Sequence, residues 1–548
     1  MKKRIAIGSI AMLAFLVLGM AAYDNMYLKI NQNIDVFGRV YKEIVSNYVD
    51  EVDPEMFMRS GIDGMLETLD PYTVYLAGKD EDDIDLLTNG QYGGVGISIG
   101  IRDGIVTVLS PTEGYSAYKQ GVKAGDRIIE IDGVKITTAN PDSVRSKVRG
   151  EPGTTVRMKI EREGEKNLIE FTLVREEIQV NNVTYSGYVT EKIGFIKLER
   201  FSRRAGEEVR QAIKELKAKG DLKGVVLDLR DNPGGLLEAA VETVSKFAPK
   251  GSTIVSTRGR KGTEERTYTV EEEPVAAELP LAILVNKNSA SASEIVAGAI
   301  QDLDRGIIVG TRSFGKGLVQ TIVPLNYKAS MKITTARYYI PSGRCIQEID
   351  YLHKNKDGVF TLTPDSLKRD FKTTNGRSVK ELGGIAPDST IEALSHSEYY
   401  SELMRKAMFF KFATIYVSKH PAQDGELEIT PQVMKEFEQY LADQKFEFVE
   451  PAERKLSDLK EQMKKEKYSS ASISAVDVLV SQLRNEKTNT FARYSDELKN
   501  ELSEELNSRY VGERGRERAA LRHDTQAQIA ASLLMNKKGY EGMLKQKK

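Results

Sequence analysis

The stretch Leu281–Gln320, LAILVNKNSASASEIVAGAIQDLDRGIIVGTRSFGKGLVQ, decides the fold of the middle of this chain. It begins with the apolar run LAILV, which predicts a buried strand, and continues through small residues into EIVAGAIQDL, whose spacing predicts a helix. The segment RGIIVG then predicts a second strand. A strand, a helix and a strand in this order are typical of an α/β domain.

Three serines, Ser289, Ser291 and Ser293, lie where the first strand of this stretch meets the helix. A small hydroxyl residue at such a junction suits an exposed nucleophile, because the first N–H groups of a helix have no intrahelical partner and create a positive potential. The spacing alone does not choose among the three serines.

Lys316 stands between two glycines after the second strand. About twelve helical residues carry the chain roughly 18 Å away at 1.5 Å per residue. A strand of about five or six residues returns it a similar distance at about 3.3 Å each. We therefore expect Lys316 near the N-terminus of the helix, where a serine and a lysine make a nucleophile–base pair.

The segments SASASEI and FGKGLVQ, with Ser291 and Lys316 25 positions apart, resemble the carboxy-terminal processing peptidases, the tail-specific Ser-Lys family. The resemblance implies that Ser291 is the nucleophile, that Lys316 is the general base and that Gln320 orients the lysine. A lysine acts as a base near pH 7 only if its pKa falls from about 10.4, a differential of roughly 4–5 kcal/mol. Burial by the flanking residues Phe314, Leu318 and Val319, and the helix N-terminus, would act in that direction.

The segment DLRDNPGG, Asp228–Gly235, follows the predicted strand GVVLDLR and resembles the glycine loop of the same family. The resemblance implies an oxyanion hole in which Gly234 or Gly235 supplies one backbone N–H and Ala292 supplies the other. A simple turn between a strand and a helix would have the same composition. The segments Thr334–Gln347 and Glu381–Asp388 also match the family.

Residues 83–177 resemble a PDZ domain, because a glycine loop is followed at the expected distance by GDRIIEIDG. The loop lets backbone N–H groups surround a chain-terminal carboxylate, and the strand GISIGI offers an edge along which a peptide extends. The peptide-binding residues implied by the resemblance are Gly93, Gly94, Val95, Gly96 and Ile97. Arg149, in an RGxPGT stretch, fixes a turn or, as a hypothesis, relays groove occupancy to the peptidase core.

The predicted fold class is a multidomain α/β protein. A PDZ domain is inserted between an N-terminal helical segment and an α/β Ser-Lys peptidase core, and a C-terminal helical region follows. The predicted boundaries are 1–22 for a signal peptide or membrane anchor, 23–82 for the helical segment, 83–177 for the PDZ domain, 178–400 for the core and 401–548 for the C-terminal region. The last region is charged and helical and matches no motif, which favours a packing or dimerisation module and leaves a homodimer or a larger assembly open.

The N-terminus has the outline of an export signal: a basic cluster at residues 2–4 precedes 18 apolar or small residues, Ile5–Ala22. As a helix these would reach roughly 27 Å, close to the minimum for a bilayer, so the length favours a retained inner-membrane anchor over a cleaved signal. The sequence therefore predicts an exported, periplasmic protein. We expect it to act on proteins or peptides with apolar C-terminal tails.

Charge and composition exclude other classes of function. The formal net charge of −1, with both signs interspersed, indicates no nucleic-acid partner. The four histidines show no metal-ligand spacing, and the single cysteine, Cys345, cannot form an intrachain disulfide. Two alternatives stay open, namely a non-catalytic PDZ adaptor that binds exposed C-termini and an acyl-CoA hydratase-like fold, although the export signal disfavours the second.

Overall fold

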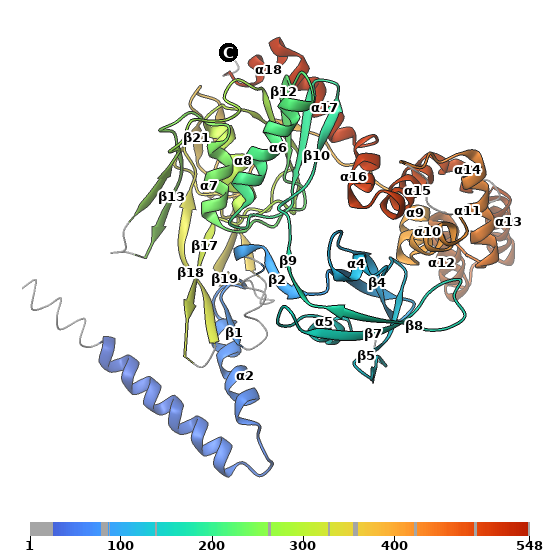
Figure 1. Cartoon of the computed structure of the whole chain (residues 1–548), viewed down its shortest axis with the longest axis horizontal. Helices are drawn as coiled ribbons and strands as arrows, with labels where there is room; N and C mark the ends of the chain where they lie inside the picture. Colours follow the sequence, from blue (N-terminus) through green and yellow to red (C-terminus); the bar gives the residue numbers. More distant parts are fainter. Residues whose placement is uncertain are drawn as a thin grey trace, which may run out of the picture. The chain divides into compact units, whose positions relative to one another are not determined.

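A computed structural model describes residues 26–77, 86, 88–137, 140–260, 265–326, 329–354, 360–420, 425–486 and 490–545 (Figure 1). The chain divides into two compact units, residues 1–78 with 320–334 and residues 79–319 with 335–548. The predicted leader, residues 5–22, lies outside the described residues. Among the described residues, no helix is both long and apolar enough to span a bilayer.

The first unit begins with two helices, at residues 26–47 and at α2 (Pro54–Leu66). The Asp53 side chain caps α2 by accepting a hydrogen bond from the Met56 N–H (2.8 Å). The segment then ends in a strand that the helical prediction missed, β1 (Val74–Ala77), which pairs antiparallel with the start of β18 (Ala329–Tyr339). The aromatic and branched residues of VYLA follow a proline turn, and such residues favour a strand once a partner strand is present.

The PDZ region of the second unit is a small sheet with the strand order β3-β4-β5-β7-β8, covered by helix α5. Asn140 caps α5 by accepting a hydrogen bond from the Asp142 N–H (2.9 Å). The elements of this region are β2 (Gln91–Gly94), β3 (Ile97–Arg102), β4 (Ile105–Pro111), α4 (Ser116–Lys119), β5 (Arg127–Ile131), β6 (Val134–Lys135), α5 (Pro141–Val148), β7 (Thr155–Glu161), β8 (Ile169–Val174) and β9 (Glu176–Gln179).

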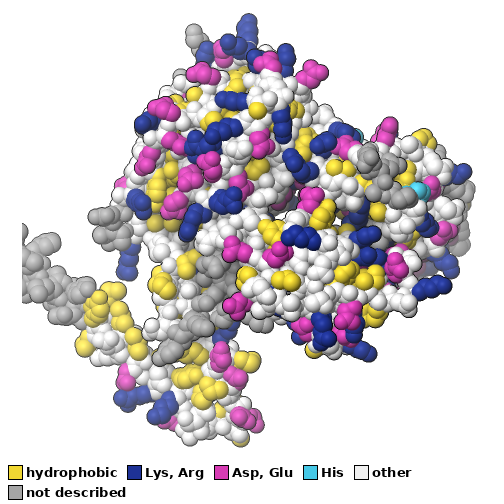
Figure 2. Space-filling view, viewed as in Figure 1, with side chains coloured by type: hydrophobic (Ala, Val, Ile, Leu, Met, Phe, Trp, Pro, Cys, Tyr) yellow, Lys and Arg dark blue, Asp and Glu magenta, His cyan; other side chains and the backbone are white. Residues whose placement is uncertain are grey.

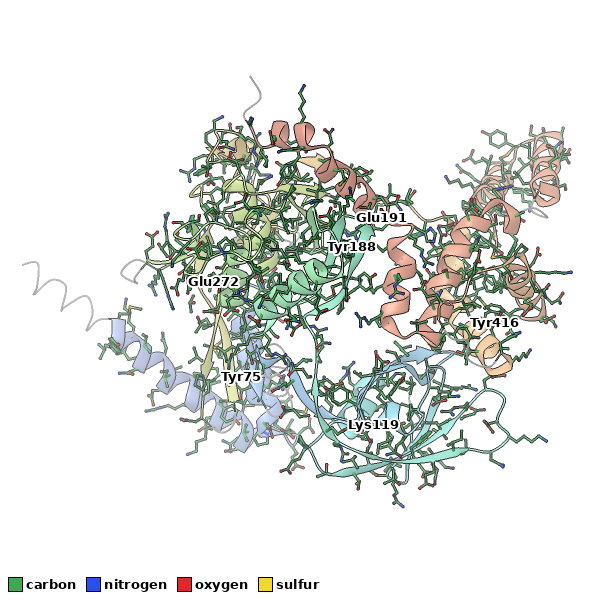
Figure 3. The ribbon with its side chains drawn as sticks, turned by 45° about the horizontal axis from the view of Figure 1, so that its top comes forward. Tyr75, Lys119, Tyr188, Glu191, Glu272 and Tyr416 are labelled. Carbon is green, nitrogen blue, oxygen red and sulfur yellow. The ribbon has the colours of Figure 1, made fainter. Side chains whose placement is uncertain are left out.

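The predicted peptidase core is built on a six-stranded sheet with the order β10-β11-β12-β15-β16-β23, parallel except for the β10–β11 pair. Helices α6, α7 and α8 connect its strands (Figure 1). Tyr188 on β10 meets α6, where its hydroxyl donates to the Leu216 carbonyl (2.6 Å; Figure 3). The elements are β10 (Val183–Thr190), β11 (Ile193–Leu198), α6 (Ala205–Lys219), β12 (Gly224–Asp228), α7 (Leu237–Ser245), β15 (Leu281–Val285), α8 (Ala292–Asp302), β16 (Ile307–Gly310) and β23 (Ser389–Thr390).

The chain also forms a second sheet and short hairpins. Strand β18 begins in the first unit and ends in the second, where it pairs antiparallel with β13. The remaining elements of this part are β13 (Thr253–Gly259), β14 (Arg266–Thr269), β17 (Leu318–Pro324), β19 (Ile349–Lys354), β20 (Phe360–Leu362), the 3-10 turn Asp365–Leu367, β21 (Asp370–Lys372) and β22 (Ser378–Lys380).

Both faces of the core sheet are buried, and the two faces have different covers. Side chains alternate along a strand, so Val225 and Leu227 of β12 pack with α6, α7 and α8, whereas Val226 faces the other way. That second face is covered by the C-terminal helices α17 (Thr525–Met535) and α18 (Lys537–Met543). A sheet buried on both faces explains why its central strands read as continuous apolar runs.

The rest of the C-terminal region forms its own helical cluster, whose core is rich in aromatic residues. Within the second unit this cluster also meets the PDZ region, where Lys411 on α10 pairs with Asp103 (2.7 Å). Positive and negative side chains are interspersed on the face shown in Figure 2. The helices of the cluster are α9 (Glu398–Arg405), α10 (Met408–Lys419), α11 (Pro431–Asp443), α12 (Pro451–Lys465), α13 (Ser470–Glu486), α14 (Thr490–Arg493) and α15 (Ser495–Tyr510), and α16 (Glu513–Leu521) leads to α17.

The cover provided by α17 predicts a stability effect far from the peptidase motifs. Leu534 is 4% exposed against the core sheet, whereas its neighbour Met535 is 50% exposed. Leu534→Ala should lower the free energy of unfolding of the core by about 2–5 kcal/mol, because it removes buried methyl groups and leaves a cavity. Met535→Ala is the matched control and should change the calorimetric unfolding transition little. Equal effects of the two substitutions would contradict the packing described.

Candidate active site

Three neighbouring parallel strands, β12, β15 and β16, deliver the candidate site from their carboxyl ends. The loop after β12 is the glycine loop, the loop after β15 carries Ser291, and the loop after β16 carries Lys316. Because the carboxyl ends of adjacent parallel strands meet at one edge of a sheet, segments about 60 residues apart in sequence become neighbours.

The structure distinguishes the three serines that sequence spacing left open. Ser289 and Ser293 are fully buried, and their hydroxyls donate to the carbonyls of Leu229 (2.7 Å) and Asn232 (2.9 Å). Ser291 is partly exposed and is the N-cap residue of α8, with φ 56° and ψ −114°. A residue other than glycine at positive φ is strained, and such strain is found at functional sites. This arrangement favours Ser291 as the nucleophile.

Glu294, which was not predicted as a site residue, joins the serine loop to the lysine loop. Its carboxylate is completely buried and accepts four hydrogen bonds. One oxygen, Oε2, accepts from the backbone N–H of Ser291 (2.9 Å) and from that of Lys316 (2.8 Å). The other, Oε1, accepts from the Ser313 hydroxyl (2.6 Å) and the Gly315 N–H (2.7 Å). The pattern Ser-x-x-Glu at a helix start is a capping-box signature that could have identified it.

Tyr338, the first tyrosine of TTARYYIPSGRCIQ, makes a second connection between the same two loops. The Tyr338 hydroxyl lies 3.1 Å from the carbonyl oxygen of Ser291 and also contacts that of Lys316. Tyr338 is buried, so its hydroxyl needs these partners. The backbones of Ser291 and Lys316 are therefore brought together at both their N–H and their C=O groups.

Lys316 itself is half-buried, and two glycines allow the tight path of its loop. Gly315 has φ +88°, and a Cβ there would lie 2.6 Å from the Glu348 Cβ. Of the three apolar residues expected to cover the lysine, Leu318 is buried, Val319 is half-buried and Phe314 is 39% exposed. Phe314 thus covers less than the sequence suggested, because the loop turns it towards solvent.

Gln320 belongs to the first unit, in which its Nε2 donates to the Thr334 hydroxyl (3.2 Å). It lies on β17, four positions after Lys316. Its predicted role, to orient the lysine, stays a prediction.

The glycine loop lies directly against the nucleophile. A Cβ on Gly234 would come within 2.9 Å of the Ser291 Cβ and 3.0 Å of the Ala292 nitrogen, so only glycine fits there. The Gly234 N–H already donates to the Asn232 side-chain oxygen (2.9 Å). Among the residues that the structure describes, the N–H groups of Gly235 and Ala292 have no acceptor. Of the three N–H groups predicted for an oxyanion hole, those of Gly235 and Ala292 are thus available to a ligand, whereas Gly234 is required for close approach; the oxyanion hole itself stays a prediction.

Asp231 holds the glycine loop against the serine loop. Its carboxylate accepts hydrogen bonds from the side-chain amides of Asn286 (3.0 Å) and Asn288 (2.8 Å). Partial burial acts to raise the pKa of Asp231, but the hydrogen bonds from Asn288 and Asn286 outweigh it and hold that pKa below its ordinary value. A charged carboxylate thus fixes the spacing of the two loops.

The two other family segments hold the far end of the helix that begins at Ser291. Arg344 is 1% exposed and donates to Asp302 (2.9 Å) and to the Gln301 side chain (2.8 Å), both in the last turn of α8. Asp388 accepts from Gln301 (3.1 Å) and from the Ile308 N–H (2.8 Å). These motifs act by fixing α8 at its C-terminal end.

The predicted carboxylate loop of the PDZ region links β2 to β3. Within the described part of the chain, the N–H groups of Val95 and Gly96 have no acceptor, and β3 pairs only with β4, which leaves its other edge unpaired. An open edge beside N–H groups that have no acceptor suits an extended peptide that ends in a carboxylate. Gly93 and Gly94 end β2, and Ile97 begins β3.

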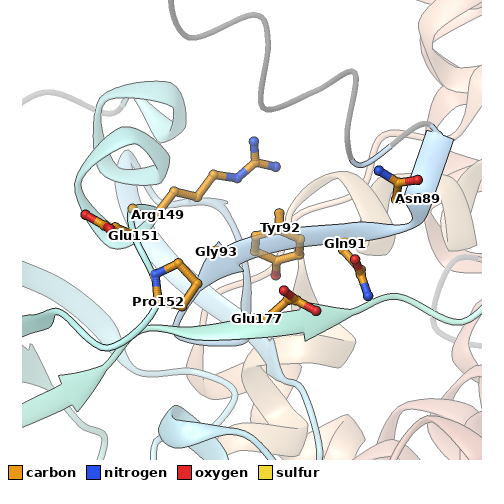
Figure 4. Close-up of a pocket in the computed structure, with 9 residues that line it drawn as sticks. Asn89, Gln91, Tyr92, Gly93, Arg149, Glu151, Pro152 and Glu177 are labelled. Carbon is orange, nitrogen blue, oxygen red and sulfur yellow. The ribbon is translucent and has the colours of Figure 1, made fainter.

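Arg149 borders a cavity of about 440 Å³ that Tyr92 and Gly93 of β2 also line (Figure 4). Its guanidinium lies over the Tyr92 ring, 4.9 Å from the centroid, and Glu151 and Glu177 also line the cavity. Burial raises the pKa of the Tyr92 hydroxyl despite the nearby Arg149, so the ring stays neutral. The structure thus places Arg149 where the PDZ loop, the end of α5 and β9 meet.

Other candidate chemistry receives no support from the described residues. There, no group of three or more His, Cys, Asp or Glu side chains is arranged to hold a metal ion. Cys345 is buried, which raises the pKa of its thiol and makes the thiolate scarce. His396 and His420 interact with Glu497 and Tyr416 in the C-terminal helical cluster rather than with the serine loop.

Four family models match successive parts of the chain. The models are an activating protease CtpB N-terminal domain at residues 20–80, a PDZ domain at 107–162, peptidase family S41 at 192–353 and the C-terminal helical domain of a probable PDZ-protease at 399–534. The last match shows that the C-terminal region, which matched no motif by inspection, is a domain shared with other PDZ-proteases.

Curated relatives agree with these matches. A carboxy-terminal-processing protease of Bartonella bacilliformis is 40% identical over 57% of this chain and 72% of its own length. The carboxy-terminal processing protease CtpB of Bacillus subtilis is 32% identical over 68% of this chain and 79% of its own. A solved structure of a photosystem II D1 C-terminal processing protease is 26% identical, covers 65% of this chain and 92% of that chain, and has a TM-score of 0.35.

The chain belongs to the carboxy-terminal processing peptidases of family S41. It is a serine protease of this family with a PDZ domain, and the adaptor and hydratase-like alternatives are not needed.

The burial of Glu294 predicts a pH effect. Desolvation raises the pKa of Glu294 to about 7 although its four hydrogen bonds oppose the rise. The folded state then keeps a proton that the unfolded state loses above pH 4.5. The stabilisation from this proton is present below pH 4.5 and is lost as pH rises to about 7, a change of about 3 kcal/mol in the free energy of unfolding. The melting temperature of the wild type, measured by calorimetry, should therefore fall as pH rises from 4.5 to about 7. In Glu294→Gln this contribution to the fall should be absent. Parallel pH profiles for the two proteins would contradict it.

Proposed function

We propose that this protease cleaves exported proteins after its PDZ domain has bound their C-terminal tails, with Ser291 as nucleophile and Lys316 as general base. The observation that carries the proposal is the shared pair of contacts described above: Glu294 accepts from both backbone N–H groups, and Tyr338 contacts both carbonyls. A serine and a lysine held together at a helix N-terminus are the parts of a Ser-Lys hydrolytic site.

The reaction proceeds by acyl transfer. A neutral Lys316 amine takes the proton of the Ser291 hydroxyl as the Ser291 oxygen attacks the peptide carbonyl. The N–H groups of Gly235 and Ala292 stabilise the resulting oxyanion, and two such donors contribute several kcal/mol to lowering the barrier. The protonated lysine then gives its proton to the departing amine, and water hydrolyses the acyl-enzyme with Lys316 again as base.

The tail-binding step uses the PDZ loop. The carboxylate of a substrate tail would accept hydrogen bonds from the N–H groups of Val95 and Gly96, while its last residues extend along the open edge of β3. Ile97 and Ile99 of β3 are partly buried against the apolar core that contains Val144 and Val148 of α5, so an apolar tail along β3 would extend this core.

The cellular location rests on the N-terminal sequence. The basic residues 2–4 and the apolar segment 5–22 support export, with the segment retained as an inner-membrane anchor and the protease domains in the periplasm. In this arrangement substrates are extracytoplasmic proteins with exposed tails.

Two substitutions test the dyad directly. Ser291→Ala and Lys316→Ala should each abolish cleavage of an unstructured protein with an apolar tail while the melting temperature stays near that of the wild type. Lys287→Ala, an exposed lysine in the serine loop, is the control and should keep full turnover. Unchanged cleavage in either dyad variant, followed by gel electrophoresis and mass spectrometry of the products, would refute the assignment.

A third substitution tests communication between the two domains. Arg149→Ala removes the guanidinium that lies over Tyr92 beside the PDZ loop. It should lower the turnover stimulated by a tail peptide several-fold while leaving the peptide's dissociation constant unchanged, because the N–H groups that bind the carboxylate remain. Arg145→Ala, on the preceding turn of α5, is the control. Stimulation equal to that of the wild type would exclude the relay.

A further inference from the structure

The segment LDPYTVYL has no part in the reaction described so far, yet its aspartate makes a dense set of hydrogen bonds. The Asp70 carboxylate accepts from the backbone N–H of Tyr72 (2.9 Å), from the N–H of Thr73 (3.1 Å) and from the Thr73 hydroxyl (3.1 Å). These bonds close the turn between α2 and β1, the usual local role of an aspartate that precedes proline and two further residues.

The same turn also holds a residue more than 260 positions further along the chain. The Thr334 hydroxyl donates to Asp70 Oδ1 (3.1 Å), and the Thr334 N–H donates to the Thr73 hydroxyl (3.2 Å). Thr334 lies on β18, and β1 continues the turn by pairing with β18 at Val74 and Lys332. Thr334 is thus fixed at its side chain and at its backbone by one turn, within one compact unit.

The chemistry of this chain of contacts sets the direction of every hydrogen bond in it. An ionised carboxylate only accepts, so the single hydroxyl proton of Thr334 points to Asp70. The Thr334 oxygen can then only accept from Gln320, and it does so from Nε2 at 3.2 Å. The orientation of the Gln320 amide is therefore decided: its NH₂ faces Thr334, and Oε1 is left as the acceptor.

We propose that Asp70 and Thr334 are positioning residues of the peptidase. They fix the Gln320 amide so that its oxygen, rather than its NH₂ group, is presented to an amine donor. This inference rests on the proposed function and on the role predicted for Gln320, which is to orient the general-base lysine. An amine can be oriented through its N–H groups only by an acceptor. A Gln320 amide turned the other way could only donate to the lone pair of the neutral amine, which is the electron pair that must take the Ser291 proton. Asp70 and Thr334 then act on the reaction through Gln320.

The test combines Thr334→Val, which keeps the shape of the side chain and removes its hydroxyl, with Thr334→Ser, which keeps the hydroxyl. Thr334→Val should lower kcat about tenfold with KM unchanged, as expected for the loss of one oriented hydrogen bond, and should shift the acidic limb of the kcat/KM profile. Thr334→Ser should restore both. Thr335→Val, at the next and exposed position of the strand, is the matched control and should behave like the wild type.

A double-mutant cycle separates positioning from general stability. In a Gln320→Ala background, Thr334→Val should cause no further loss, because the amide it orients is gone. Asp70→Asn should resemble Thr334→Val. An amide in place of the carboxylate can donate to the Thr334 oxygen, and the hydroxyl proton of Thr334 can then point towards Gln320, so the orientation of the Gln320 amide is no longer fixed. Circular dichroism and melting temperatures establish that each variant is folded, and Asp70→Glu replaces Asp70→Asn if the latter does not fold.

The outcomes distinguish this inference from the proposed function. Full kcat and an unshifted pH profile in Thr334→Val, or losses that multiply in the double variant, would overturn the positioning role and leave the Ser-Lys dyad intact. Full activity in Gln320→Ala, with Ser291→Ala inactive, would also overturn the positioning role but would not contradict the Ser-Lys dyad. Full activity in Ser291→Ala would overturn both.

Discussion

One buried carboxylate shared between two peptide N–H groups is the constraint on which the candidate site depends. Glu294 Oε2 accepts from Ser291 and from Lys316, so the loops after two neighbouring strands have a fixed separation. Replacing such a group leaves buried donors without an acceptor, which costs more than the hydrogen bond itself contributes. The remaining contacts, from Tyr338 and from Asp231, add to a spacing that Glu294 sets.

The regions on either side of the peptidase motifs contribute to the same architecture. The C-terminal helices α17 and α18 bury the second face of the core sheet, so this region is part of the core as well as a separate helical cluster. Arg230, at the end of the strand that leads into the glycine loop, donates to the Asp524 and Gln526 side chains at the start of α17. At the other end of the chain, the Asp70 turn holds the residue that contacts Gln320. Residues of the candidate site are therefore held by contacts between segments that are far apart in the sequence.

Much of the fold followed from local pattern because the pattern reports burial directly. LAILV became β15 with every residue buried, and EIVAGAIQDL became most of α8. The strand at Val74–Ala77 was missed since a four-residue strand has no periodicity of its own and forms only where β18 is available. Glu294 was overlooked for a related reason: three of its four donors come from residues 313–316, a segment that is separate from Glu294 in sequence.

The sequence by itself determined which chemistry this protein carries, because motif residues and their order reflect the reaction that they perform. Tertiary structure alone decided which of three adjacent serines is exposed, which glycine N–H is left without an acceptor, and what the C-terminal third covers. Each of these features depends on partners from segments that are distant in the sequence. The local sequence pattern does not indicate which distant segment will supply the partner.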